Sequence, residues 1–250
     1  MIEWRPGGAE LIAVDQLLDN PTLLELMRGP SVTKIGIDAP FGWPAEFVDA
    51  IAAYRTLGTW PVKDRTRLYL RETDRAVRAI CRQNPLSVTT DRIAFAAMRC
   101  AELLTEYSTA TGRPLDRSGA GVVVEVYPAA ALRQWEISPA AWATDKGGYK
   151  GHGPTTEAAR RARLVDLVAE RLRGTLDIPP SFLERCYASD DVLDALICAL
   201  VARAVEAAKS LPISDSVAVA PKALQAAAEE GWIHLPLAGS LSGDLARAAG

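Results

Sequence analysis

The stretch Gly121-Val122-Val123-Val124-Glu125-Val126 contains glycine or valine at five of its six positions and a single charge, at Glu125. A continuous apolar run of this kind is typical of a strand that is buried on both faces. A second β-type run covers residues 32–39, carries Asp38 near its end and stops at Pro40. Burying a charge is expensive unless a partner neutralises it. The two runs therefore predict a sheet with carboxylates at the ends of two strands.

A third acidic cluster lies at the head of an apolar helix, in Asp190-Asp191-Val192-Leu193-Asp194. Asp194 follows Asp190 by one helical turn and lies beside the apolar stripe, so it is expected near the core. Carboxylate oxygens are the ligands that hard divalent cations prefer. A site that holds divalent cations through Asp38, Glu125 and this cluster is the simplest single explanation of the three groups of acids.

Each of these acids also has a structural interpretation, and the sequence does not decide between the two. Asp38 can accept hydrogen bonds from loop amides ahead of Pro40. Glu125 can form a buried ion pair with an arginine. Asp190 and Asp191 suit the first turn of a helix, where negative charge interacts favourably with the helix dipole.

Strand and helix signals alternate along the chain, which predicts an α/β architecture with mixed strand directions. We expect one domain over residues 1–250, with a helical insertion at about 45–115 and a less regular tail over 210–250. A hairpin of strands is expected at residues 2–5 and 10–15, joined by Pro6-Gly7-Gly8. Helices are expected at residues 45–57, from 66 onward, 93–107, 129–135, 156–172 and from 190 into 204.

Composition narrows the classes of function. The chain has 250 residues, 49% of them hydrophobic, which is enough for one sizeable core, and its net charge of −3 argues against a generally basic nucleic-acid coat protein. Its four cysteines form no CxxC pair and only two histidines are present, so a zinc finger has little to build on. The start shows no signal-peptide pattern, and no apolar run approaches the roughly 20 residues of a membrane span. We therefore expect a cytoplasmic protein that does not enter a membrane.

Basic residues supply candidate phosphate contacts. Arginines at a spacing of three or four residues would form a basic stripe along one helix, able to follow a phosphate backbone; they are Arg67, Arg71, Arg75, Arg78 and Arg82. The alternative is a solvated helix face paired with Glu72 and Asp74. Lys150 lies in the glycine-rich segment 146–154, expected to be a mobile loop, where it can approach a phosphate or belong to a plain surface turn.

Four segments together resemble a known family. They are residues 37–44 (IDAPFGWP), 71–75 (RETDR), 124–128 (VEVYP) and 190–196 (DDVLDAL). In this order and spacing the chain resembles the domain of unknown function family 429, described as predicted ribonuclease H-like nucleases. The resemblance implies a ribonuclease H-like mixed sheet flanked by helices, with acids that bind two divalent ions.

This resemblance defines the functional prediction, a metal-dependent nuclease that hydrolyses phosphodiester bonds with Mg²⁺ or Mn²⁺. Its catalytic residues would be Asp38, Glu125, Asp191 and Asp194, with Asp190 as a further metal ligand. Arg71, Arg75 and Lys150 would contact the nucleic acid.

The chain departs from the family pattern at its start. Such folds open with a central strand that carries a first aspartate, whereas Met1 begins at what corresponds to the second strand. We expect that this first central strand is missing and that the chain starts downstream of its natural start. The alternative function follows from that absence: a non-catalytic ribonuclease H-like module that binds nucleic acid or a protein partner and retains its acids for structure.

Overall fold

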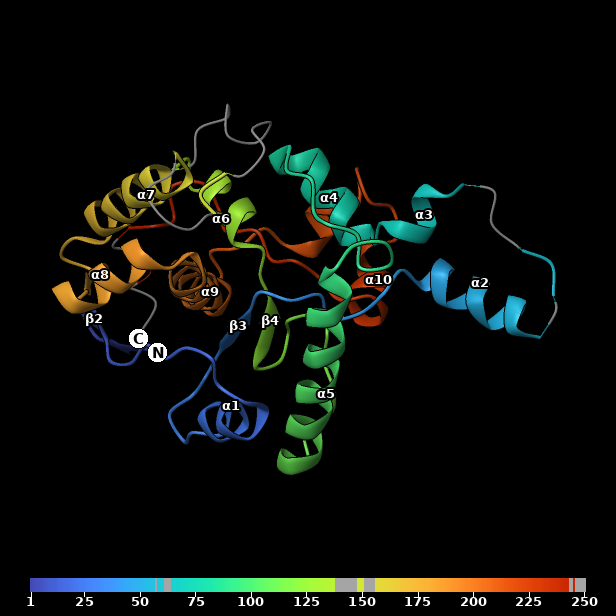
Figure 1. The fold of residues 1–250 in the computed structure, drawn as a ribbon, viewed down its shortest axis with the longest axis horizontal. Helices are drawn as coiled ribbons and strands as arrows, with labels where there is room; N and C mark the ends of the chain where they lie inside the picture. The colour runs from blue at the N-terminus through green and yellow to red at the C-terminus, as the bar shows by residue number, and fades with distance from the viewer. Residues whose placement is uncertain (57, 61–63, 138–147, 151–155, 243–244, 246–250) are drawn as a thin grey trace. The chain divides into compact units, whose positions relative to one another are not determined.

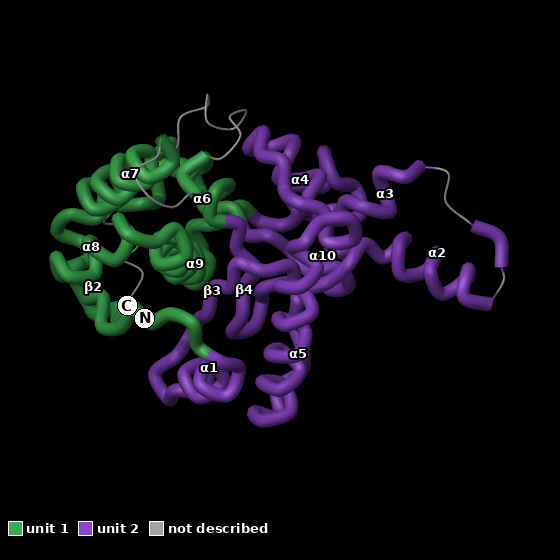
Figure 2. The backbone as a smooth tube through the Cα atoms, in the orientation of Figure 1, with its two compact units in different colours: residues 1–18, 128–211, 235–250 green, residues 19–127, 212–234 purple. Residues whose placement is uncertain are grey.

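The computed structural model describes residues 1–250 except 57, 61–63, 138–147, 151–155, 243–244 and 246–250. The described chain forms two compact units, each assembled from segments that are separate in the sequence (Figure 2). Unit 1 contains residues 1–18, 128–211 and 235–250, and unit 2 contains residues 19–127 and 212–234. Both units combine strands with helices, so the predicted α/β class is confirmed.

Unit 1 is built on a three-stranded mixed sheet in the order β1-β2-β5. β1 (Ile2–Arg5) and β2 (Gly8–Leu11) form the predicted antiparallel hairpin, and Gly7 adopts a φ of +89° in its turn. β5 (Leu176–Asp177) pairs in parallel with β2. A two-residue strand is too short for a periodic signal, which is why the sequence did not predict it.

The described residues of unit 1 also form the helices α6 (Pro128–Gln134), α7 (Thr156–Leu172), α8 (Pro180–Ala188) and α9 (Asp190–Glu206) (Figure 1). α8 packs against both α7 and α9. The Ser189 side chain caps α9 by accepting a hydrogen bond from the Val192 N–H. The predicted apolar stripe of α9 is confirmed, since Leu193, Ile197 and Leu200 are fully buried.

Unit 2 contains a parallel pair of strands, β3 (Ile35–Ile37) and β4 (Val123–Glu125), in which Ile37 lies opposite Glu125. Around them lie the helices α1 (Asn20–Met27), α2 (Ala45–Arg55), α3 (Thr66–Tyr69), α4 (Glu72–Cys81), α5 (Ile93–Thr111) and α10 (Ala223–Glu229), and the 3-10 helix η2 (Ile213–Ser216). The predicted helical content of residues 45–115 is confirmed by α2 to α5.

Two apolar clusters stabilise unit 2. The first joins α1 and α5 to the strand pair, with Leu104 and Phe41 nearly inaccessible to solvent beside Val123. The second packs α4 against α10 through alanines around Trp232. Both clusters bury side chains that come from widely separated segments, and this burial drives the folding of the unit.

One local prediction needs correction. The basic stripe does not follow one helix, because α3 ends at Tyr69 and the chain is extended at Leu70 and Arg71 before α4 begins. In the less regular tail, the segment 232–236 forms isolated bridges, Ile233 with Glu125 and Pro236 with Ser210. Within the described ranges no helix is both long enough and apolar enough to cross a membrane.

Candidate functional site

The carboxyl ends of β3 and β4 bring two of the predicted acids to one edge of unit 2. Glu125 is the last residue of β4, and Asp38 directly follows β3 in the parallel partner strand. Asp38 is exposed, whereas Glu125 is only 2% exposed. The two acids therefore share an edge of the strand pair but experience very different environments.

Arg71 neutralises Glu125 through a bidentate ion pair. Its Nη2 lies 2.7 Å from Glu125 Oε1, and its Nη1 donates to Glu125 Oε2 at 2.9 Å. The same guanidinium contacts Asp74, with Nη2 at 3.0 Å from Oδ1 and Nε at 3.2 Å from Oδ2. Arg71 is 2% exposed and Asp74 is 1% exposed. The structure thus has the buried arginine pair that was the alternative interpretation of Glu125.

Local capping explains why Arg71 turns inward. Arg71 is the N-cap residue of α4, with extended φ and ψ of −68° and 165°, and its backbone N–H donates to Asp74 Oδ2 at 3.0 Å. This contact begins α4 as a new helix, so α3 and α4 do not form one continuous helix. Because Arg71 has left the helix, its side chain points to the interior and not along the expected stripe. A contact between Arg71 and phosphate stays a prediction, and this burial does not favour it.

The charges of this cluster are tightly coupled. Burial raises the pKa of Glu125, and the neighbouring Arg71 guanidinium and the Phe41 N–H oppose that effect. For Arg71, burial disfavours the charged form, but Asp74 and Glu125 outweigh it and raise its pKa. The Phe41 N–H donates to Glu125 Oε2 at 3.0 Å. Glu125 therefore also holds the loop that follows Asp38.

Glu230 is a member of this region that the sequence did not single out. Its carboxylate accepts from the Ala45 N–H at 2.9 Å and from the Glu72 N–H at 2.7 Å. These two donors open α2 and α4, so one carboxylate occupies the amino ends of two helices, where negative charge is favoured. The Glu230 carbonyl also accepts from Arg71 Nη1 at 3.2 Å. The only sequence signal was Gly231, which follows the end of α10.

Arg75 shows the ion-paired alternative that was proposed for the basic stripe. Its Nη2 is bonded to Glu72 Oε1, and its Nη1 donates to the Leu70 carbonyl at 3.1 Å. The side chain of Arg75 remains 25% exposed. Its contact with nucleic acid stays a prediction.

A separate cluster in unit 1 surrounds Asp194. The Tyr149 hydroxyl donates to Asp194 Oδ1 at 2.5 Å, and Lys150 Nζ lies 2.6 Å from Oδ2. Burial raises the pKa of this carboxyl, and Lys150 and Tyr149 oppose the shift. Arg161, itself buried, donates to the Tyr149 carbonyl at 3.1 Å and so fixes the segment that carries Lys150.

The remaining predicted residues of unit 1 are placed only in part. Asp190 is half-buried and Asp191 is exposed, both in the first turn of α9. Of the glycine-rich segment 146–154, residues 148–150 are described, whereas His152 and the rest lie outside the described residues.

Comparison with known protein families identifies the family of this chain. The family model described as "Protein of unknown function (DUF429)" matches residues 1–217. The chain belongs to this family. No curated protein and no solved structure gives a significant match. The four segments that suggested the resemblance lie inside the matched range, and three of them meet in the DUF429 chain's buried cluster through Phe41, Arg71 and Glu125.

The contacts within each unit do not fit a two-cation centre. Across the part of the chain that the structure describes, no group of three or more His, Cys, Asp or Glu side chains is arranged to hold a metal ion. Both oxygens of Glu125 are bonded to Arg71, and both oxygens of Asp194 are bonded to Lys150 or Tyr149. The predicted Mg²⁺ or Mn²⁺ ligation by Asp38, Glu125, Asp190, Asp191 and Asp194 stays a prediction.

His234 should make the stability of unit 2 depend on pH. The ring is 7% exposed, and Nε2 donates to the Ser118 carbonyl at 2.9 Å while Nδ1 has no partner among the described residues. Burial lowers the pKa of His234 below 6.5. The unfolded chain therefore binds a proton near pH 6.5 that the folded chain does not bind, so the contribution of His234 to stability falls as the pH drops below that value.

We expect the free energy of unfolding to fall by up to about 1.4 kcal/mol per pH unit below about 6.5. Thermal melts over about pH 5.5 to 7.5 measure this effect. His234→Gln, which keeps a donor for the Ser118 carbonyl, should flatten the dependence. Parallel curves for both proteins would contradict the assignment.

Proposed function

We propose that this chain is a non-catalytic binding module for a protein partner, built on a ribonuclease H-like fold whose acids are retained for structure. One observation carries the proposal. Each buried carboxylate assigned to catalysis is paired with a basic side chain assigned to substrate binding, Glu125 with Arg71 and Asp194 with Lys150. The two sets of predicted functional groups thus neutralise each other.

The energetics of the Arg71 pair support this proposal. A cation that took Glu125 as a ligand would have to displace a guanidinium bonded to both carboxylate oxygens. Leaving a buried charge without its partner costs about 3–5 kcal/mol. Asp74 and the Glu230 carbonyl would lose the same donor group. Metal binding at Glu125 would therefore carry a large free-energy cost.

The same pairing favours a protein partner over nucleic acid. All three predicted phosphate contacts are engaged with carboxylates: Arg71 with Glu125, Arg75 with Glu72 and Lys150 with Asp194. The net charge of −3 supplies no general attraction for a polyanion.

A metal-dependent nuclease is the second candidate, and Asp38 favours it. This exposed acid lies at the carboxyl edge of a parallel strand pair, which is where ligands bind in α/β sheets. The family resemblance supports the same candidate. It implies that Asp38, Glu125, Asp190, Asp191 and Asp194 are ligands of Mg²⁺ or Mn²⁺.

A cleavage assay separates the two candidates. Labelled single- and double-stranded DNA and RNA are incubated with the chain at enzyme concentrations up to that of the substrate, with Mg²⁺ or Mn²⁺ and with EDTA as the control. The binding-module proposal predicts no metal-dependent product. Cleavage that EDTA abolishes and that Asp38→Asn removes would contradict it. Asp38 is exposed, so this variant should fold, and Glu102→Gln on the exposed side of α5 is a matched control.

A further inference from the structure

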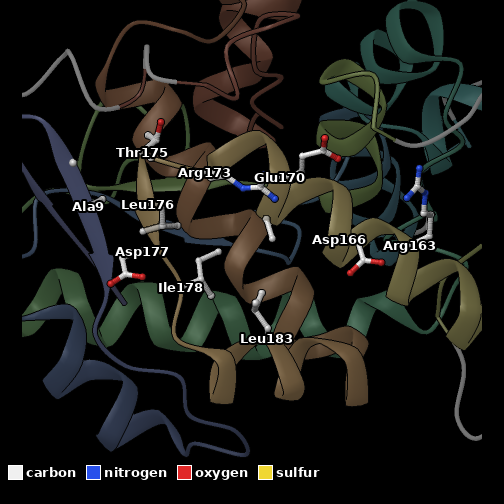
Figure 3. A pocket seen from close by; sticks show the side chains of 13 residues that line it. Ala9, Arg163, Asp166, Glu170, Arg173, Thr175, Leu176, Asp177, Ile178 and Leu183 are labelled. Atoms are coloured by element: carbon white, nitrogen blue, oxygen red, sulfur yellow. The ribbon is translucent and has the colours of Figure 1, made fainter.

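Unit 1 contains an open cavity that none of the predicted functions uses (Figure 3). Its volume is about 840 Å³, within the range of about 300–1,000 Å³ that is usual for ligand sites. β2, β5, α7 and α8 supply its walls. Apolar side chains line one part of it, namely Ala9, Leu176, Ile178 and Leu183.

Charged residues of α7 and of the turn that follows it form another wall of the cavity. Arg163, Asp166 and Glu170 lie along one side of α7, and Arg173 comes directly after its last residue, Leu172 (Figure 3). The charge order is basic, acidic, acidic, basic, over about 15 Å. Asp177 of β5 adds a third carboxylate to the lining, near Ala9 and Ile178 and on the far side of Arg173 from Asp166 (Figure 3). The row from Arg163 to Arg173 is thus acidic in its middle and basic at both ends.

These charges are largely available to a ligand. Asp166 accepts a hydrogen bond from the Tyr187 hydroxyl at 2.7 Å. Arg163, Glu170 and Arg173 form no ion pair with any residue that the structure describes, although each has an opposite charge three residues away in the sequence. All three are exposed. A ligand with complementary charges would therefore not have to break existing pairs.

We propose that this cavity binds an extended peptide segment of a partner protein in which one basic side chain is flanked by acidic side chains two residues away on each side. The basic group would face Asp166 and Glu170, and the acidic groups would face Arg163 and Arg173. This inference rests on the proposed function as a protein-binding module and names the chemistry of the partner.

The dimensions suit an extended segment. Alternate side chains of an extended chain point to the same face, and five residues span about 15 Å, which matches the length of the charged row from Arg163 to Arg173. β5 is at one edge of the sheet formed by the described strands, and an edge strand offers backbone groups to an added chain. The apolar lining can accept the spacer residues.

Fluorescence anisotropy with two labelled peptides tests the proposal on the full chain. One peptide carries the pattern Glu-Ala-Lys-Ala-Glu and the other the reversed pattern Lys-Ala-Glu-Ala-Lys. We expect the first to bind at least about tenfold more tightly, because like charges placed opposite each other oppose binding. The double variant Arg163→Glu with Arg173→Glu should lose this preference. Arg171→Glu, on the same helix but outside the cavity, should keep it.

Three results would overturn the inference: equal binding of both peptides, a preference that the double variant retains, or no binding of the first peptide at about millimolar concentration. Glu170→Lys gives a second test, since it should weaken the binding of the first peptide and strengthen that of the reversed one. The cleavage assay keeps the two proposals distinct. Absent peptide binding without metal-dependent cleavage overturns this site alone, whereas metal-dependent cleavage overturns the proposed function.

Discussion

Arg71→Met is expected to lower the free energy of unfolding by about 3–5 kcal/mol, because it leaves buried carboxylates without their counter-charge. Arg71 contacts Glu125 and Asp74 at 2.7–3.2 Å, and both acids are almost inaccessible to solvent. Methionine keeps much of the side-chain volume, so the loss reports the charge and the hydrogen bonds more than a cavity. Urea denaturation at neutral pH measures the effect.

Arg78→Met is the matched control for this prediction. Arg78 also belongs to α4, but it is exposed and forms no ion pair with a described residue. Its replacement should change stability little. Adding Glu125→Gln to Arg71→Met should recover part of the lost free energy of unfolding, because one buried carboxylate without a partner is then removed. Equal stability of the Arg71 and Arg78 variants would contradict the role assigned to the cluster.

Gly231→Ala is expected to destabilise the chain by about 2–5 kcal/mol, through backbone strain and overpacking together. The φ of Gly231 is +87°, and an added Cβ would lie 2.6 Å from Glu125 Oε2 and 2.8 Å from Phe41 Cβ. Neither neighbour can move easily, since Glu125 is held by Arg71 and the Phe41 backbone by Glu125. Chemical denaturation measures this loss too.

Gly112→Ala separates strain from crowding in the same unit. Gly112 has a φ of +67° at the end of α5, and an added Cβ would meet nothing within 4 Å. It should therefore show only the backbone penalty of about 1–2 kcal/mol. If the two glycine variants lose the same stability, the close packing assigned to Gly231 is wrong.

Periodicity and capping signals were sufficient for much of the secondary structure. The valine run predicted β4, and the acids at the head of an apolar stripe predicted the start of α9. The charged partners could not be predicted in the same way. Arg71 and Glu125 are 54 residues apart, and several arginines were available to pair with that glutamate. The local cap of α4 turns Arg71 inward, but its contact with Glu125 of β4 depends on tertiary packing, which the sequence does not show.

Glu230 is a second residue whose role could not be predicted from the sequence. In the sequence it is one of two glutamates at the end of an alanine-rich helix, with nothing to distinguish it. Its importance comes from the amino ends of α2 and α4, which are contributed by a distant segment. Exposed Asp38, in contrast, keeps the position that its strand-end pattern predicted.

A thermal melt with and without about 1 mM Mn²⁺ tests most directly whether the carboxylates are neutralised internally. A cation bound with a Kd of about 10 μM would stabilise the folded chain by about 2.7 kcal/mol and raise Tm by several degrees. We predict no rise, because Arg71 and Lys150 already occupy the positions of the cations at Glu125 and Asp194. A rise in Tm that Asp194→Asn abolishes would contradict this account and support the metal-dependent nuclease.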